Sequence, residues 1–289
     1  MKIHDTYSEA FDGLYTRAII TAKNRQYLER AAFGATALPS TVVGRTEGGI
    51  ERWLTSDETP DGRPGALVQV WGSWRKDTKK FEHELSLRIR QGVLVIPTTA
   101  VYSALDSGGT LDMMEKIGHC GDGFEEVKTI HGRNMISIPL MMGDFLIERY
   151  MGREKGIMGG NLWLLCESEK AALDAGERAV EAVLGVEGAV TPFGICSAGS
   201  KVETNYPEIG PTTNHQFCPT LRGRCADSRV PEGVKSIPEI VINGTTIEVV
   251  RKAMRNAIKR IEGIGGVRGV SAGNYGGKLG KYKIYLKEL

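Results

Sequence analysis

A strand–helix–strand pattern occurs twice in the second half of this 289-residue sequence. In the first copy an apolar run at 161–168 is followed by a segment at 169–184 with apolar residues at helical spacing, and then by a second apolar run at 188–193. The second copy has the same order: a strand at 238–243, a helix at 246–261 and a strand at 266–273. The copies are too far apart for a solenoid, so they predict two packed halves of one split-βαβ, ferredoxin-like lobe.

The first half of the chain repeats this theme less regularly. Its predicted strands and helices are 16–22, 24–33, 41–43, 65–71, 79–91 and 93–98, of which 24–33 and 79–91 are helical. A glycine-rich stretch at 152–160 interrupts the pattern. We therefore expect an α+β protein of two ferredoxin-like lobes, with an N-terminal α/β lobe at 1–150 and a C-terminal α/β lobe at 151–289 that holds the βαβ half-repeat.

Charge and hydropathy exclude several classes of partner. Thirty-seven Lys and Arg against 35 Asp and Glu leave a formal charge of +2, so no overall field attracts nucleic acid or an anionic membrane. No stretch approaches the roughly 20 apolar residues of a spanning helix, and the amino terminus lacks the apolar run of a signal peptide. The sequence predicts a cytoplasmic protein with no nucleic-acid or membrane partner.

The cysteines do not indicate a disulfide framework. There are five, an odd number, and they are widely spaced in a chain large enough to fold without cross-links, which favours reduced thiols. The nearest approach to a metal site is His215-x-x-Cys218 followed by Cys225, but it lacks a paired CxxC and an obvious fourth ligand. We predict no metal and interpret these cysteines as small apolar residues.

Two familiar catalytic patterns fail on this sequence. Gly276-Gly277-Lys278 resembles part of a phosphate-binding loop, but Ala272 and Leu279 occupy positions that require glycine and Ser or Thr. No G-x-G-x-x-G fingerprint joins a strand to a helix either. Cys196, with His215 as base, partly imitates a nucleophile elbow, but its second glycine is displaced, so a turn residue is the simpler interpretation.

Glu239 is a candidate for acid catalysis. It lies among apolar residues in a segment, 236–243, that should form an internal strand. A buried carboxyl resists ionisation and can therefore act as a general acid near neutral pH. The alternative is that Glu239 points to solvent or to a basic side chain nearby, and the pattern alone favours this alternative.

Seven segments together resemble one known family. They are Thr59–Gly65, Gly121–Glu126, Gly159–Asn161, Ser200–Val202, Thr213–Thr220, Pro238–Gly244 and Ser271–Tyr282. In order and over nearly the whole chain, they look like formylmethanofuran:tetrahydromethanopterin formyltransferase, and the last segment, SAGNYGGKLGKY, is highly specific.

The resemblance implies a reversible formyl transfer between the amine of methanofuran and N5 of tetrahydromethanopterin. It also implies two ferredoxin-like lobes and dimers that pair into tetramers. No cofactor is expected, because both carriers act as co-substrates. The catalytic acid of the family lies in an E-I-V-I-N-G strand, and the matching residue here is Glu239.

Anionic tails on both carriers would call for basic and polar side chains on the glycine-rich loops. The candidates are Ser200, Lys201, Lys278 and Arg63, with Asn274 as a further donor to the oxyanion. Each has the alternative of a solvated surface position, and the turn that contains Arg63 could be purely structural.

One segment departs from the family pattern. Where archaeal members have a longer proline–glycine run, this chain has Thr191–Val202, which should lie beside the cleft. The chain could therefore be the formyltransferase subunit of a methylotroph formyltransferase/hydrolase complex. A non-catalytic pterin-binding or assembly module is the alternative from another class.

Overall fold

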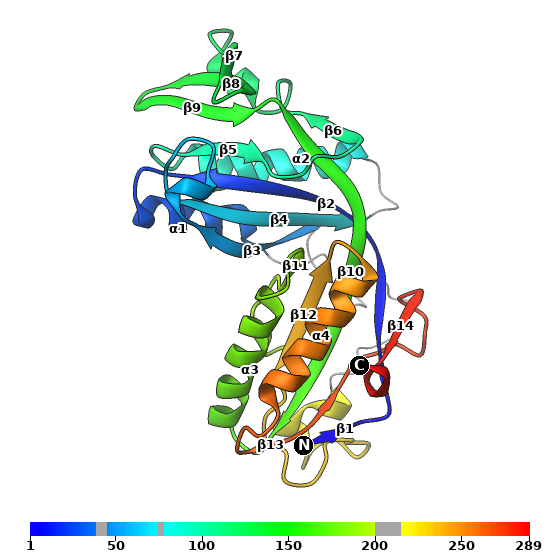
Figure 1. The fold of residues 1–289 in the computed structure, drawn as a ribbon. Coiled ribbons are helices and arrows are strands. Elements are labelled where there is room, and N and C mark those ends of the chain that lie inside the picture. The colour runs from blue at the N-terminus through cyan, green and yellow to red at the C-terminus, as the bar shows by residue number, and fades with distance from the viewer. Residues whose placement is uncertain (39–44, 74–77, 200–214) are drawn as a thin grey trace. The chain divides into compact units, whose positions relative to one another are not determined.

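The computed structural model describes residues 1–38, 45–73, 78–199 and 215–289. These residues form two compact units, shown in Figure 1. The C-terminal unit combines Met1–Asp12 with Gly156–Leu289, and the N-terminal unit is Gly13–Lys155. Two long strands, β2 (Tyr7–Thr21) and β10 (Tyr150–Cys166), contribute residues to both units.

The C-terminal unit has the predicted double βαβ order. After β10 come α3 (Glu169–Leu184), β11 (Ala189–Val190), β12 (Glu239–Gly244), α4 (Ile247–Ile261) and β13 (Val267–Ser271). The hydrogen-bonded order is β11-β12-β10-β13, and each of these pairs is antiparallel. The first strand therefore lies between the third and the fourth, which is the split-βαβ arrangement of a ferredoxin-like sandwich.

Both helices of this unit begin at polar capping residues. The Ser168 hydroxyl accepts a hydrogen bond from Ala171 N at 3.2 Å, and the Thr246 hydroxyl accepts one from Val249 N at 3.2 Å. Their apolar faces pack with β10, β12 and β13 in one core, which includes Ala175, Ala179, Val250, Met254, Leu162, Leu164, Ile240, Ile242 and Val270. The two predicted helices are thus confirmed.

The first twelve residues belong to the C-terminal unit through three contacts. β1 (Lys2–Ile3) pairs in parallel with β13. β14 (Tyr282–Tyr285) pairs antiparallel with the start of β2, and Ala10 is part of the core described above. A final 3₁₀ turn, Leu286–Glu288, follows β14, and two others, His215–Phe217 and Pro219–Leu221, precede β12.

The N-terminal unit repeats the same connectivity. Its strands and helices are β2, α1 (Arg25–Thr36), β3 (Thr46–Leu54), β4 (Gly65–Ser73), α2 (Thr78–Ile89) and β5 (Ala100–Ser103). The strand order β3-β4-β2-β5 again puts the first strand between the third and the fourth. Both lobes are therefore ferredoxin-like, and the predicted α+β fold class is confirmed.

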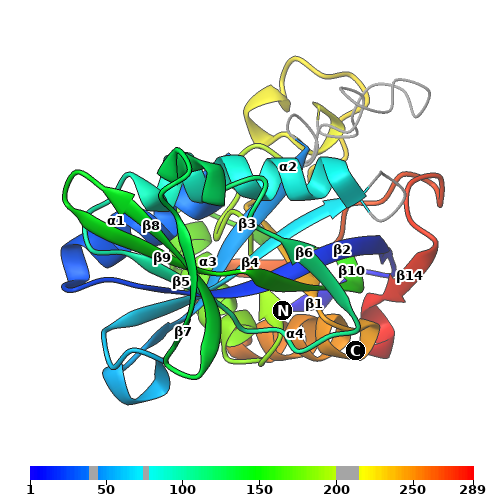
Figure 2. The ribbon, with the colours of Figure 1, turned by 90° about the horizontal axis from the view of Figure 1, so that it is seen from above.

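A strand extension distinguishes the N-terminal unit. β7 (Glu126–Ile130), β8 (Arg133–Leu140) and β9 (Gly143–Glu148) form an antiparallel meander, visible in Figure 2, and β9 pairs in parallel with β5. β6 (Gly109–Asp112) pairs with the start of β10. Short 3₁₀ turns lie at Ser56–Glu58 and Gly118–Gly121. Over the described parts of the chain, no helix is both long and apolar enough to span a membrane.

The predicted strand at 93–98 is wrong. The chain instead continues α2 into a π-helical turn, Arg90–Leu94, and β5 begins only at Ala100. Val93 is buried on this turn, and the Thr99 hydroxyl donates a hydrogen bond to its carbonyl at 2.9 Å. An apolar run too short to show a period cannot distinguish a strand from a buried helix end. The predicted strand at 41–43 lies outside the described residues.

The glycine-rich stretch at 152–160 is part of β10 and not an interruption between elements. Gly159 has a φ of 86°, and the pairing with β12 shifts register between Ile157 and Gly160. The predicted lobe ranges were 1–150 and 151–289. In the structure the two units divide between Lys155 and Gly156, with residues 1–12 on the C-terminal side.

Candidate active site

Glu239 is the first residue of β12 and pairs with neighbours on both sides. Its register partner on β10 is Trp163. Its backbone N–H and carbonyl each form a 2.8 Å hydrogen bond with Cys196 in an isolated bridge. These pairings fix the backbone, and the residue is only 1% exposed. Glu239 therefore does not face solvent, contrary to the alternative that the pattern favoured.

Two neutral donors hold the Glu239 carboxyl group. Asn161 Nδ2 and Trp163 Nε1 each donate a hydrogen bond to Oε1 at 3.1 Å. Both donors come from β10, and because they are two residues apart their side chains lie on the same face of the strand. Because the donors are uncharged, they hold Oε1 in place without requiring the carboxyl to be ionised.

Asn161 also connects the carboxyl group to the glycine-rich loop at 273–280. Its Oδ1 accepts a hydrogen bond from Gly273 N at 3.0 Å, and its backbone N–H donates to Ser8 Oγ at 2.8 Å. A Cβ on Gly273 would lie 2.7 Å from the Trp163 ring, so this close approach requires glycine. The start of the loop is thereby fixed against the residues that hold Glu239.

A second buried carboxylate, Glu9, organises the rest of this loop. Its Oε1 accepts hydrogen bonds from Tyr275 N and Gly277 N at 2.6 Å, and its Oε2 accepts from Leu279 N and Gly280 N at 2.9 and 3.0 Å. Glu9 is 2% exposed. Sequence analysis missed this residue because its partners lie more than 260 positions away, and no local pattern marks it.

Asn274 and Lys278, two predicted site residues, lie on this loop in different environments. Asn274 Nδ2 donates to Thr6 Oγ1 at 3.1 Å and to the Tyr7 carbonyl at 3.3 Å, so its amide anchors the loop to the start of β2. Lys278 is exposed. Ser200 and Lys201 lie outside the described residues.

Two hollows meet at the Trp163 ring. The smaller, about 230 Å³, is lined by Glu239, Trp163, His215 and Phe217 among others. The larger, about 480 Å³, is lined by Trp163, Phe217, Asn274 and Arg229 among others. The Trp163 and Phe217 rings lie 4.9 Å apart at 57°. The C-terminal unit therefore offers two spaces that share this ring pair in their lining, and the buried carboxyl group of Glu239 lines the smaller one.

Cys196 is a poor nucleophile in this setting. Burial raises the pKa of its thiol above the ordinary value, and the nearby Glu239 adds to the effect. A raised pKa leaves the thiol protonated at neutral pH, whereas nucleophilic cysteines need a lowered one. This supports the interpretation of Cys196 as a residue whose role is in its backbone, which bonds to β12.

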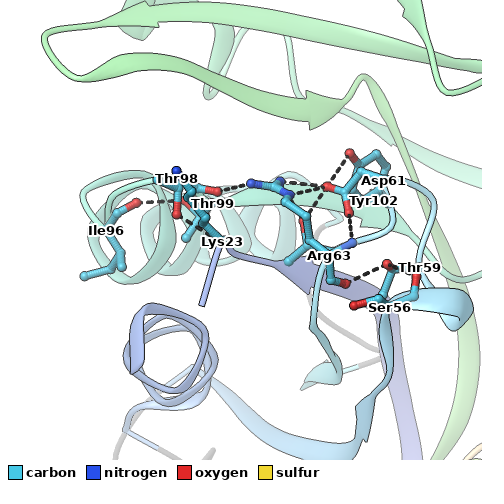
Figure 3. Close-up of polar contacts among 10 residues, drawn as sticks. Lys23, Ser56, Thr59, Asp61, Arg63, Ile96, Thr98, Thr99 and Tyr102 are labelled. Carbon is cyan, nitrogen blue, oxygen red and sulfur yellow. Dashed lines mark hydrogen bonds and ion pairs between the residues drawn. The ribbon is translucent and has the colours of Figure 1, made fainter. Parts of the chain in front are cut away.

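Arg63 lies in the N-terminal unit, in the network of Figure 3. Its Nε and Nη2 donate to Asp61 Oδ2 at 2.9 and 2.7 Å, Nη2 also donates to Thr21 Oγ1 at 2.8 Å, and Nη1 donates to the Thr98 carbonyl. Tyr102 OH donates to the same Asp61 oxygen at 2.9 Å. The structure thus binds the Arg63 guanidinium internally and brings Glu239 and Asn274, but not Arg63, into one unit.

The electrostatics of this network favour an ionised Asp61. Burial opposes ionisation, but the hydrogen bonds from Arg63 and Thr21 outweigh it, and the pKa of Asp61 is lowered below its usual value. Burial, followed by the charge of Asp61, raises the pKa of Tyr102 far above its usual value. The phenol therefore stays protonated and remains a donor to Asp61.

Comparison with known proteins identifies the family. The model described as formylmethanofuran-tetrahydromethanopterin formyltransferase matches residues 1–140, and that of its proximal lobe matches residues 143–289. A formyltransferase-like protein of Archaeoglobus fulgidus is 56% identical over 99% of this chain and 96% of its own length.

Two solved structures resemble the whole chain. The formyltransferase from Methanosarcina barkeri has a TM-score of 0.90 and 40% identity, covering 100% of this chain and 98% of its own. A chain in the formyltransferase/hydrolase complex of Methylorubrum extorquens, solved with methylofuran, has a TM-score of 0.89 and 34% identity, covering 100% and 96%. The family predicted from the motifs is confirmed.

Proposed function

We propose that this chain transfers a formyl group reversibly between methanofuran, or an analogue, and N5 of tetrahydromethanopterin. The chain belongs to the formylmethanofuran-tetrahydromethanopterin formyltransferase family. The observation that carries the proposal is the Glu239 carboxyl, buried on the wall of a hollow and held by Asn161 and Trp163. The nucleophile, the formyl group and the departing amine are then supplied by the two carriers, which act as co-substrates.

The arrangement suits proton transfer at a tetrahedral intermediate. When an amine attacks the formyl carbon, the carbonyl oxygen gains charge and the departing nitrogen must gain a proton. With Oε1 accepting two hydrogen bonds, a protonated Glu239 carries its proton on Oε2. Glu239 gives this proton to the departing nitrogen and regains one from the attacking amine, so the reaction runs in either direction without a metal, nucleotide or prosthetic group.

The two hollows are candidates for the reacting ends of the two carriers, because Trp163 and Phe217 line both of them. We assign the reacting groups to the Trp163–Phe217 ring pair, where the hollows adjoin. Asn274 lines the larger hollow and Lys278 lies on the same loop, so both stay candidates for carrier contacts. Arg63, with its guanidinium bound internally, is a weaker candidate than its sequence position suggested.

Assembly is part of the proposal. We expect a cytoplasmic protein whose copies associate as dimers of dimers, as the family resemblance implies. Large apolar side chains at the end of the β7–β9 meander support association, since Met141, Met142 and Phe124 are 109%, 73% and 78% exposed.

A second candidate function has its own support. The relative with 56% identity is named only as formyltransferase-like, and one structural neighbour works inside a formyltransferase/hydrolase complex. This chain could accordingly act as a subunit of such a complex, or as a pterin-binding or assembly module.

One assay separates these functions. The purified chain is given formylmethanofuran and tetrahydromethanopterin, without metal or nucleotide, and the absorbance of the formylated pterin is followed. Rapid transfer by the chain alone supports a self-sufficient formyltransferase. Transfer only with hydrolase-complex subunits supports the second candidate, and binding of the pterin without transfer in either condition supports the module.

A further inference from the structure

Three side chains of different chemistry converge near the smaller hollow. They are His215, Cys225 and Asp227, each of which offers one ligand atom, and these atoms all lie within 4.8 Å of one another. Cys225 Sγ is 2.9 Å from Asp227 Oδ1, and His215 Nε2 is 3.6 Å from Asp227 Oδ2. Formyl transfer as proposed above gives none of the three a role in the chemistry.

The spacing of these atoms is close to what one metal ion needs. Tetrahedral zinc with bonds of about 2.0–2.3 Å places its ligand atoms roughly 3.3–3.8 Å apart. Cys225 Sγ and His215 Nε2 approach different oxygens of Asp227, at 2.9 and 3.6 Å. One ligand atom from each residue lies within 4.8 Å of the other two, so small side-chain movements bring the three to the separations that zinc requires. His215 and Asp227 are exposed and Cys225 is half-buried, so an ion can reach all three.

The chemistry of the ligands selects the metal. A thiolate, an imidazole and a carboxylate together suit zinc, whereas calcium and magnesium prefer oxygen ligands alone. We propose that His215, Cys225 and Asp227 bind one zinc ion, which thereby links the two ends of the segment 215–227. Three protein ligands leave a fourth position for water.

The regular structure of this segment is two single-turn 3₁₀ helices, His215–Phe217 and Pro219–Leu221. Gln216 Nε2 donates to Asp227 Oδ2 at 2.5 Å, and Arg222 Nη2 donates to the Val234 carbonyl at 3.1 Å. The Phe217 ring, within this segment, lies against the Trp163 ring at 4.9 Å with a tilt of 57°, and Trp163 Nε1 donates to Glu239. Zinc at the ends of the segment would therefore hold in place a ring that lines both hollows.

Zinc binding can be measured independently of formyl transfer. The full chain, dialysed against chelator with its thiols reduced, is titrated with Zn²⁺ in competition with a chromogenic chelator. We expect one equivalent to bind. Cys225→Ala and Asp227→Asn should each lower the affinity for Zn²⁺ at least about 100-fold. Loss of a residue that only hydrogen-bonds to a metal ligand already costs up to about that factor. Cys120→Ala is the matched control, because Cys120 lies in the N-terminal unit, and should bind like wild type.

Closure of the segment gives a second readout. Arg224 is exposed within it, so trypsin can cut there, and zinc should slow this cut in wild type and Cys120→Ala but not in Cys225→Ala. A thiolate-to-metal absorption band on Co²⁺ addition, absent from Cys225→Ala, would support the same ligand. Substoichiometric binding, equal affinity in wild type and both ligand variants, or zinc binding that leaves cleavage at Arg224 unchanged would overturn the proposal. None of these outcomes depends on whether the chain transfers formyl groups.

Discussion

At the scale of single residues, Glu239 gives the sharpest test of the mechanism. In Glu239→Gln the amide oxygen can still accept from Asn161 and Trp163, so the fold should persist while the transferable proton is lost. We expect kcat for formyl transfer to fall about 10²–10⁴-fold, the usual contribution of general acid catalysis, with little change in KM. Steady-state kinetics and a thermal unfolding curve of the same preparation check this.

The matched control for this change is Glu262→Gln, at the exposed end of α4. It makes the same Glu-to-Gln change at a residue that is not among those lining either hollow, and should leave kcat unchanged. Wild-type turnover in Glu239→Gln would remove the mechanism and favour the binding or assembly module.

Glu9 is the residue on which the glycine-rich loop depends. Its two oxygens accept four backbone N–H groups, and in Glu9→Gln the amide would present N–H donors to two of them. We expect a loss of about 3 kcal/mol in the free energy of unfolding, comparable to one or two charged hydrogen bonds, measured by urea denaturation. Asp5→Asn, which removes an exposed ion pair with Lys287, should change stability by less than about 0.5 kcal/mol.

At the scale of elements, the turn at 59–65 is predicted to stabilise the N-terminal unit. Asp61 has a lowered pKa, so its contribution is present above the unfolded-state pKa of about 4 and is lost as the pH falls through the folded value. Asp61→Asn should cost about 3 kcal/mol at pH 7, because Arg63 loses its buried partner, and the gap from wild type should narrow below about pH 4. Urea midpoints at several pH values test this; a constant gap would contradict the role of the charge.

Elements also show what could be predicted from sequence. The helix Glu169–Leu184, with its Ser168 cap and long apolar period, was predicted to its ends because these signals are local. The strand predicted at 93–98 failed because Val93 is buried as the end of a helix, a choice made by packing. The meander β7–β9 was not predicted: β7 is exposed at four of its five positions and offers no apolar run, whereas β8 has four consecutive buried residues, Met135–Ile138, that are compatible with a strand.

The same distinction holds for the site. Glu239 could be named because it is a charge among apolar residues and lies in a family motif. Glu9 and Asn161 act through partners far along the chain, such as Gly280 and Glu239, so no spacing in the sequence reveals them. Arg63 could be named as a candidate from its motif, but its internal partners, Asp61 and Thr21, could not.

At the scale of the whole molecule, the N-terminal unit is one continuous stretch of chain, whereas the C-terminal unit is built from two separate stretches. We therefore expect only the N-terminal unit to fold when a single continuous stretch is expressed alone. Residues 13–155 have their own core and should give a cooperative unfolding curve when expressed alone. Residues 156–289 alone lack Ala10, Glu9 and the strand that pairs with β14, and should fail to fold until a peptide of residues 1–12 is added. Amide NMR spectra of each piece check this. A folded 156–289 without the peptide would show that the first residues are dispensable.

The pairing of β14 with the start of β2 also affects how the two units can be ordered along the chain. Leu286 N–H bonds to the Thr6 carbonyl at 3.0 Å and Lys287 Nζ lies 2.9 Å from Asp5 Oδ2, so the two ends of the polypeptide run side by side. A circular permutant with Leu289 linked to Met1 and a new start at Gly13 would make each unit one uninterrupted stretch. Both stretches would then carry the same βαββαβ order in tandem, which is the arrangement that duplication of a single ancestral unit leaves.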